Sequence, residues 1–258
     1  MNDLNKILSV FDPVSLDEIN EVKLMSRIDR KYWFHISKLN EFLQMALPYY
    51  HILEINGQRL MEYKTEYFDT TDNQMYFYHH RREVPRHKIR LRKYLSTSTG
   101  FLEVKLKTNK KLTVKSRIEN NADFSEFNCK DEQFISNYTP YNCHEIYPVI
   151  NNRFRRLTLI NKDKHDRCTI DISPVFWNGK DSVSLENLVI FELKKGQSIN
   201  TSPMVAIAKK LKIRQRGMSK YCTGRALLEP ELKQNAFKPR LRYLQKHIIK
   251  QSTKTWNY

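Results

Sequence analysis

The stretch Lys88–Lys107, KIRLRKYLSTSTGFLEVKLK, predicts a β-hairpin with one apolar and one charged face. Side chains alternate across a strand, so every second residue of each strand points to the same side of the hairpin. The polar positions are Lys88, Arg90 and Arg92 before the turn at Ser96–Gly100, and Glu103, Lys105 and Lys107 after it. Like charges on neighbouring strands repel one another, so this face needs water or an anion such as a triphosphate to compensate its charge.

The chain as a whole is strongly basic, which predicts an acidic partner. Its 258 residues include 45 Lys and Arg against 28 Asp and Glu, a formal net charge of +17. Nucleic acid, a membrane surface or a phosphorylated small molecule would suit such a charge. The 14 Tyr and 13 Phe residues supply a sizeable core, so the composition favours an ordered protein over a disordered one.

The segments on either side of the hairpin alternate in the same way. Further strands are expected over residues 27–34, 60–68, 112–118, 149–160, 167–173 and 188–195, and helices over 38–45, 73–81, 202–211 and 218–228, with mixed helical pieces in 123–146. Several strands carry a charged face opposite an apolar one, so the fold requires two kinds of buried surface. An α+β fold satisfies both if about eight antiparallel strands form a barrel with a polar lumen and helices pack outside it.

Seven short motifs occur in order along the chain. They are RIDRKYW from Arg27, YFDTT from Tyr67, KIRLRKY from Lys88, LEVKLK from Leu102, VKSR from Val114, FELK from Phe191 and SKY from Ser219. Together they resemble the VTC domain, the polyphosphate-polymerase domain of the vacuolar transporter chaperone family, which is one of the triphosphate tunnel metalloenzymes. The resemblance extends over about residues 24–228, nearly the whole chain.

This resemblance implies an eight-stranded tunnel that binds inorganic polyphosphate and adds the terminal phosphate of ATP to it, with Mn²⁺ or Mg²⁺ as cofactor. The residues that it implies for phosphate binding are Lys31, Arg90, Arg92, Lys105, Lys107, Lys115, Arg156, Lys194, Ser219 and Lys220. Five of them are expected to act in catalysis: Arg90, Arg92, Lys105, Lys115 and Lys220. Glu192 is implied as the metal ligand and Glu103 as a further carboxylate at the metal.

Three other functions compete with the polymerase. The first is a sensor of polyphosphate or inositol phosphates that has no turnover. The second is a metal-dependent triphosphate hydrolase, but the Glu-x-Glu-x-Lys signature of the hydrolase branch is replaced here by Arg27-x-Asp29-x-Lys31. The third is a basic nucleic-acid-binding protein, which would need an open cationic stripe with aromatic platforms. No motif indicates it, so no nucleic-acid partner is expected.

No Gly/Ser-rich or Pro-rich linker divides the chain. We therefore expect a lead-in over residues 1–23, one tunnel domain over 24–228 and a basic tail over 229–258. The four cysteines form no CxxC pair, which favours reduced thiols over a zinc site. No apolar run approaches 18 residues and no signal peptide is evident, so a soluble, cytoplasmic protein is expected. This expectation is compatible with a membrane partner that is recruited separately.

Overall fold

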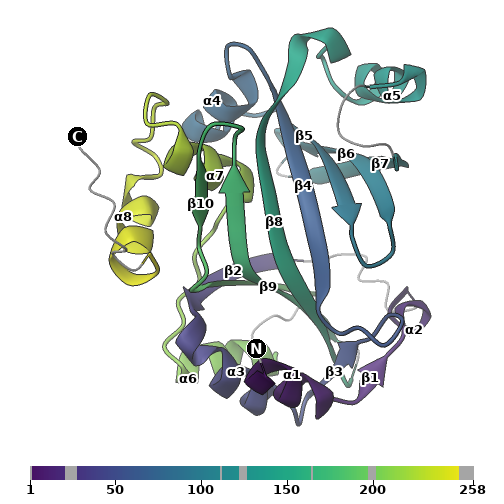
Figure 1. The fold of residues 1–258 in the computed structure, drawn as a ribbon, viewed down its shortest axis with the longest axis vertical. Helices are drawn as coiled ribbons and strands as arrows, with labels where there is room; N and C mark the ends of the chain where they lie inside the picture. Colours follow the sequence, from purple (N-terminus) through teal and green to yellow (C-terminus); the bar gives the residue numbers. More distant parts are fainter. Residues whose placement is uncertain are drawn as a thin grey trace.

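The structure, a computed structural model, describes residues 2–20, 28–110, 112–121, 127–163, 165–196 and 202–249. This part of the chain forms eight α-helices and a sheet of eleven strands (Figure 1), which confirms the α+β class. The helices are α1 (Asn2–Ser9), α2 (Leu16–Asn20), α3 (Leu39–Ala46), α4 (Gln74–Arg81), α5 (Cys129–Tyr138), α6 (Pro203–Lys210), α7 (Lys220–Leu228) and α8 (Lys238–His247). The strands are β1 (Pro13–Val14), β2 (Ile28–His35), β3 (Tyr50–Leu53), β4 (Met61–Thr70), β5 (Arg86–Tyr94), β6 (Thr99–Lys107), β7 (Thr113–Glu119), β8 (Ile146–Asn161), β9 (Asp166–Trp177), β10 (Ser182–Ser184) and β11 (Leu188–Lys195).

The sheet is built on a path of eight antiparallel strands in the order β2-β11-β9-β8-β4-β5-β6-β7. The short strands β10 and β3 pair with β9 and β8, and β1 pairs in parallel with β3. Among the described strands, the two ends of the path, β2 and β7, are not paired with each other. Eight antiparallel strands are therefore present as expected, while the closure of a barrel is not shown.

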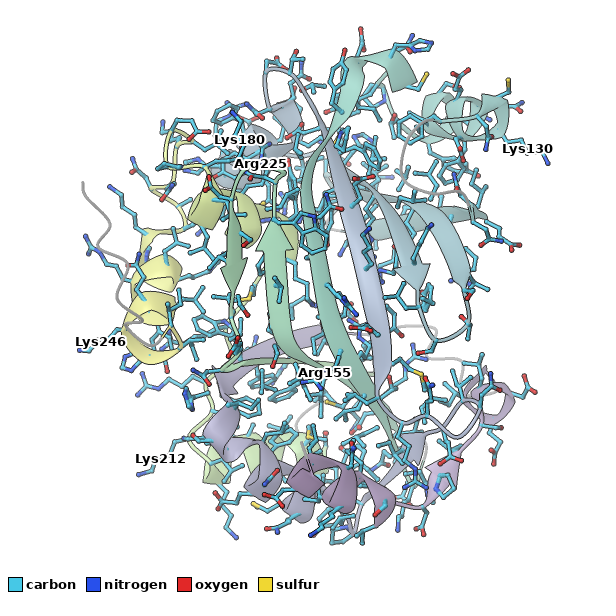
Figure 2. The ribbon with its side chains drawn as sticks, viewed as in Figure 1. Lys130, Arg155, Lys180, Lys212, Arg225 and Lys246 are labelled. Carbon is cyan, nitrogen blue, oxygen red and sulfur yellow. The ribbon has the colours of Figure 1, made fainter. Side chains whose placement is uncertain are left out.

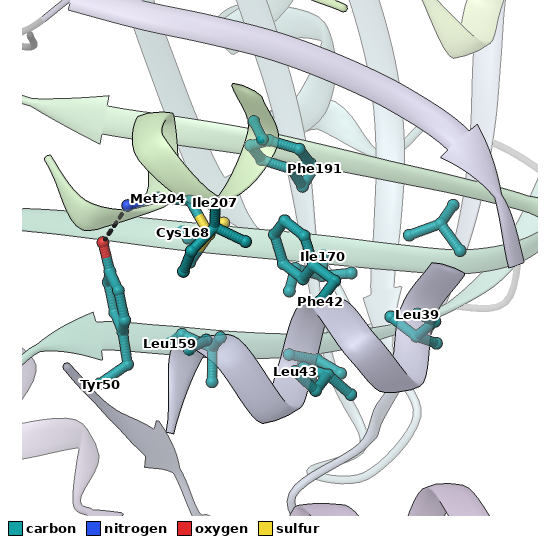
Figure 3. Packing of buried hydrophobic residues seen from close by; sticks show 14 of the residues in the cluster. Leu39, Phe42, Leu43, Tyr50, Leu159, Cys168, Ile170, Phe191, Met204 and Ile207 are labelled. Atoms are coloured by element: carbon teal, nitrogen blue, oxygen red, sulfur yellow. Dashed lines mark hydrogen bonds between the residues drawn. The ribbon is translucent and has the colours of Figure 1, made fainter. Parts of the chain in front are cut away.

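Helices α3 and α6 cover the outer face of β8, β9 and β11 (Figure 3). Phe42 of α3 and Phe191 of β11 are both fully buried, with ring centres 5.1 Å apart. On the other side of this core, the Tyr50 hydroxyl accepts a hydrogen bond of 3.2 Å from the Met204 amide at the start of α6. Burial of each large apolar side chain stabilises the fold by roughly 1.5–3 kcal/mol, so this contact fixes the outer face of the sheet.

The outer face of the central hairpin packs under α5. Ile89 of β5 and Leu102 of β6 are completely buried against Phe134 and Ile135. The alternation read in the hairpin is therefore confirmed on its apolar side. Leu112, just before β7, and Val114 on β7 belong to the apolar side of the predicted strand 112–118, but they are 63% and 48% exposed. At that end of the edge strand nothing in the described part of the chain packs over them, and only Ile118 reaches the core under α5.

Other expectations differ in detail. Strands β1, β3 and β10 were not predicted, and each contains only two to four residues, too few for alternation to be visible. The basic tail contains a helix, α8, whose Leu241 and Leu244 are buried. Arg27, residues 123–126, the expected domain boundary at 23/24 and residues 250–258 lie outside the described residues. No described helix combines the length and the apolar character needed to cross a membrane.

Candidate functional site

A cavity of about 530 Å³ lies on the inner face of the sheet. Every strand of the eight-strand path contributes a side chain to it, and the start of α7 covers one side. In the described part of the chain, its lining contains ten cations, namely Lys31, Lys88, Arg90, Arg92, Lys105, Lys115, Arg156, Lys194, Lys220 and Arg240. The same lining contains only three carboxylates, Glu103, Asp171 and Glu192. Such an excess of positive charge around a concave space attracts anions strongly.

The register of β5, β6 and β7 places the cations in rows. Lys88 lies opposite Lys105 on β6, and Lys105 lies opposite Lys115 on β7. One pair further along, Arg90 lies opposite Glu103. The charged face predicted from the hairpin is therefore confirmed, and it forms one wall of the cavity. No carboxylate lies between these three lysines. The repulsion between like charges is therefore strongest in this row of the wall, and a bound anion would relieve it.

Glu103 holds the two arginines of the wall. The Arg90 guanidinium donates to the Glu103 carboxylate, and Arg92 Nε lies 4.0 Å from the same oxygen atom. Burial would raise the pKa of Glu103, but Arg90 and Arg92 outweigh burial and lower it to about 2, so the carboxylate is ionised. Arg92 Nε is buried and has no hydrogen-bond acceptor in the described structure. Arg92 lines the cavity, and its Nε is a donor that no described group of the protein satisfies.

Asp171 of β9 holds the cations on the opposite wall. Both of its carboxylate oxygens accept from Arg156, and one of them also accepts from Lys220. Its side chain is only 5% exposed. Burial opposes ionisation, but Arg156 and Lys220 outweigh burial and hold the pKa of Asp171 well below its usual range. Asp171 thus fixes the position of two cations whose remaining N–H groups face the cavity.

A third ion pair lies at the β2–β11 edge. Lys31 donates to the Glu192 carboxylate, and the two residues are direct neighbours in the register of the strands. Burial would raise the pKa of Glu192, yet Lys31 and Lys194 keep it well below its usual range. Lys194 itself is affected chiefly by burial, which lowers its pKa to about 8. Glu192 is therefore an ionised carboxylate in the cavity, flanked by two lysines.

The N-terminus of α7 points its first residues at the cavity. Ser219 caps the helix: its hydroxyl accepts from the Cys222 amide at 3.3 Å and from Lys88 Nζ at 2.9 Å. The helix lies against the sheet because residue 224 is glycine. A Cβ atom there would come within 2.5 Å of Phe176 and 2.7 Å of Ile150. Close packing of α7 therefore brings Ser219 and Lys220, with the positive end of the helix dipole, to the cavity wall.

Asp69 connects α7 to α4. Its Oδ1 accepts from the Met75 amide at 2.9 Å and its Oδ2 from the Tyr76 amide at 3.0 Å, at the start of α4. The same Oδ2 accepts from the Tyr221 hydroxyl and, at 3.2 Å, from Arg225, both on α7. Asp69 is completely buried. A single carboxylate therefore positions both helices that flank the cavity.

Binding of an anion should depend on pH through Lys105. Burial, together with Lys88 and Lys115, lowers the pKa of Lys105 from 10.5 to about 7. A bound anion favours the protonated amine, so the affinity for tripolyphosphate should be highest below pH 7 and fall as the pH rises to 8.5. Titration calorimetry at pH 6.5 and 8.5 measures this change. The variant Lys105→Gln serves as the control, because the ligand's own protonation is common to both proteins; a pH dependence unchanged in the variant would contradict the assignment to Lys105.

Eleven of the twelve residues expected in the site line this cavity; Lys107 does not. Lys107 instead lines a smaller adjoining cavity of about 100 Å³, which shares Lys88 and Lys105 with the large one. The register explains the shift, since Lys107 pairs with Thr113 beyond the row of lysines. The role of each of these residues remains a prediction.

Several lining residues were not among the expected ones. Tyr67 lies in the YFDTT motif and could have been found from the sequence by pairing it with neighbouring arginines. Asp171 lies on the polar side of its strand, where the sequence predicts a carboxylate that orients an arginine, and its pair with Arg156 confirms this. Arg240 could not, because it comes from the distant tail through α8. His79 also lines the cavity, whereas the next residue, His80, turns away and accepts from the Ala236 amide. Burial and Lys88 lower the pKa of His79 to about 2, so it is neutral.

The three carboxylates of the lining determine which metal ions the cavity can bind. Asp171 has both oxygens engaged with Arg156 and Lys220, which leaves Glu192 and Glu103 as candidate ligands. One or two carboxylates do not make a complete protein-built metal site. They fit Mg²⁺ or Mn²⁺ bound largely through phosphate oxygens. Another group of potential ligands, Glu132, Cys143 and His144, lies on α5 and the following turn, outside the cavity.

Comparison with solved structures finds proteins with some similarity in fold. Among solved structures, the Hippeastrum protein HpAC1, described as having a dominant triphosphatase activity, has a TM-score of 0.51 at 13% identity over 78% of this chain and 95% of its own. PH1819 of Pyrococcus horikoshii has a TM-score of 0.45 at 11% identity over 79% and 97% of the two chains. At these identities the similarity concerns the fold alone. No curated protein matches the chain significantly.

The sequence model of the VTC domain matches residues 26–229. The match extends over most of the chain and includes all seven motifs in full. It also includes β2 to β11 and α3 to α7, and all lining residues of the cavity except Arg240 lie within the matched range. The resemblance inferred from the motifs is thereby confirmed, and the chain belongs to the VTC domain family.

Proposed function

We propose that this protein is a polyphosphate polymerase, which transfers the terminal phosphate of ATP to a growing inorganic polyphosphate chain. The observation that supports it most strongly is the cavity, in which ten cations face three carboxylates in the described lining. Each of those carboxylates is already paired with a cation of the cavity. The remaining positive charge suits a chain of phosphates, since each phosphate unit brings at least one negative charge.

The proposed reaction needs positioning and charge neutralisation more than covalent chemistry. A terminal oxygen of the polyphosphate attacks the γ-phosphorus of ATP, a new P–O bond forms, and the bond to the leaving ADP breaks. Arg90, Arg92 and Arg156 can each bind two phosphate oxygens with a planar guanidinium, while lysines act as mobile point charges. Lys220 and Ser219 at the start of α7 lie where the helix dipole favours added negative charge. A divalent cation held by Glu192, with Glu103 nearby in the lining, would neutralise further charge on the transferred group.

The direct test is to incubate the purified protein with ATP and Mn²⁺ and to separate the products on a polyacrylamide gel stained for polyphosphate. A ladder of long chains is expected. It should be absent in the Arg90→Ala variant and retained in Lys93→Ala, which removes a cation from the same strand but from its other face. Products that never exceed the length of the nucleotide's own triphosphate would contradict the polymerase.

Glu192→Gln should separate phosphate binding from turnover. The substitution keeps the size of the side chain and removes the charge that a metal needs, so turnover should fall by about 10²-fold, equivalent to about 2.7 kcal/mol. Binding of tripolyphosphate without metal should remain or become tighter, because a negative charge leaves the cavity. Calorimetry and the gel assay measure the two effects. Full turnover in the variant would show that Glu192 is not the required ligand.

Hydrolysis of triphosphates is the second candidate, because the same cations would serve if water were the acceptor. HpAC1, which is similar in fold and is described as having a dominant triphosphatase activity, supports this second candidate. Release of free phosphate without a ladder would support the hydrolase. If neither product forms while tripolyphosphate still raises the Tm, the chain acts as a sensor that binds phosphate chains without turnover.

A further inference from the structure

A second cavity, of about 330 Å³, lies between the end of β2, helix α8 and the segment after α6. It shares no lining residue with the central cavity. Its cations are Lys38, Lys212, Arg214 and Arg216, its imidazoles are His35 and His247, and the rings of Trp33 and Tyr243 form part of its wall. Figure 2 labels Lys212 and, in α8, Lys246, on the same side of the molecule.

The charges around this second cavity are all of one sign. No Asp or Glu belongs to its described lining. The neighbouring stretch 209–220, KKLKIRQRGMSK, contains six cations and no carboxylate, and α8 across the cavity contains four Lys and Arg and no carboxylate. In the central cavity each cationic wall has its own carboxylate. The second cavity lacks such an internal partner among the described residues, so a bound anion would relieve the repulsion between its walls.

A buried donor at this cavity lacks an acceptor. Trp33 is only 2% exposed, and its indole Nε1 is buried without a hydrogen-bond partner in the described structure. An indole N–H can only donate, and buried donors are almost always paired in folded proteins. Trp33 lines the cavity with its ring, while the Nε1 atom itself is enclosed by protein.

Arg216 lines the same cavity, where two aromatic rings hold its guanidinium in position. Its guanidinium lies 4.0 Å from the centre of the Tyr243 ring and 5.5 Å from that of Trp33. These two rings meet edge to face, 5.0 Å apart, which fixes the surface on which the guanidinium rests. A cation stacked on an aromatic face keeps its N–H edges available for hydrogen bonds. The guanidinium is therefore a pre-organised donor at the cavity.

We propose that this second cavity is a binding site for a compact phosphate-bearing anion, of the size of an inorganic di- or triphosphate, separate from the central cavity. Arg216 supplies the directed donors, Lys212 and Arg214 supply charge at the rim, and the rings of Trp33 and Tyr243 hold the Arg216 guanidinium. The site lies close to the central one along the chain. The Arg216 amide donates to the Lys31 carbonyl at 2.9 Å, and the next residues, Gly217 to Lys220, line the central cavity. The proposal concerns binding alone and does not depend on which reaction the central cavity performs.

The test is calorimetric titration of the full chain with sodium tripolyphosphate, at low ionic strength and without metal. Two binding events are expected in the wild type. The variant Arg90→Ala/Arg92→Ala should lose the event of the central cavity and keep the second one. The variant Lys212→Gln/Arg214→Gln should keep the central event and weaken the second at least tenfold.

The matched control is Lys209→Gln/Lys210→Gln, which removes two equally exposed cations from the end of α6, next to the cavity but outside its lining. It should leave the second event unchanged. An equal loss in this control would show attraction to general surface charge and would overturn the site. A single binding event in the wild type that vanishes in Arg90→Ala/Arg92→Ala would also overturn it. A missing polyphosphate ladder, in contrast, would affect only the proposed reaction.

Discussion

Replacing Arg90 and Arg92 together by alanine is expected to remove the part of the tripolyphosphate-induced increase in Tm that comes from binding in the central cavity. The empty cavity is self-repelling, and a ligand present at 100 times its Kd stabilises the fold by about 2.7 kcal/mol. For a chain of this size, that free energy corresponds to a rise of about 5–10 °C. The two arginines contribute the fork-shaped donors of one wall, and Arg92 Nε has no acceptor of its own in the described structure.

The measurement is thermal unfolding with and without tripolyphosphate, with sodium chloride at equal ionic strength as the reference. The matched control is Lys64→Ala/Lys93→Ala, which removes two cations that lie opposite each other on the outer face of β4 and β5. Its anion-induced shift should equal that of the wild type. A full shift in Arg90→Ala/Arg92→Ala would place anion binding elsewhere.

The double variant also loses the ion pair with Glu103 and could unfold for that reason. A second variant that keeps this ion pair separates the two effects. Arg92→Gln leaves the bond between Arg90 and Glu103 intact. A tenfold weaker Kd, about 1.4 kcal/mol, would reduce the anion-induced shift by about 3–6 °C. A shift in Arg92→Gln equal to that of the wild type would count against Arg92 as a ligand of the anion.

The alternation of charged and apolar residues predicted the central cavity well, for a physical reason. Side chains two apart on a strand share a face, so Lys88, Arg90 and Arg92 had to lie together, whatever the rest of the fold did. The same rule assigned Glu192 and Lys194 to one face of β11. It cannot, however, say how far along the strands a cavity extends, and for that reason Lys107 was expected in the central cavity although it lies in the adjoining one.

Contacts between elements distant in the chain were not predictable from these patterns. Arg240 lies more than one hundred residues from the hairpin that it faces, and a ten-residue basic helix without motif gives no sign of its position. The packing of α7 against the sheet depends on Gly224 and on the buried Asp69. Asp69 belongs to the YFDTT motif, but neither residue indicates from the sequence that it contacts α7 or the sheet. Val114 was expected to be buried, because it lies on the apolar side of an alternating strand, but it is exposed. A strand at the edge of a sheet need not have both faces covered.

Asp171→Asn is expected to be strongly destabilising, and tripolyphosphate should compensate part of the loss. Asparagine keeps the shape of the side chain but leaves Arg156 and Lys220 without their counter-charge. Breaking a buried pair in this way costs about 3–5 kcal/mol. The Tm in the absence of anions should therefore fall by about 6–20 °C. Because phosphate oxygens can replace the missing carboxylate, the rise in Tm with tripolyphosphate should be larger in Asp171→Asn than in the wild type.

The pH dependence gives an independent check. The folded-state pKa of Asp171 is lowered, so its stabilising effect is complete above the unfolded value of about 3.9 and is lost as the pH falls through the lower folded value. The difference between wild type and Asp171→Asn in urea unfolding should therefore be constant from pH 7 to about pH 4 and shrink below it. Glu62→Gln is the control, because the pair between Glu62 and Arg153 lies on the outer face and its loss should change stability by at most about 1 kcal/mol. Equal losses in the two variants, or no extra response of Asp171→Asn to tripolyphosphate, would mean that the cations facing the cavity are not held there by Asp171.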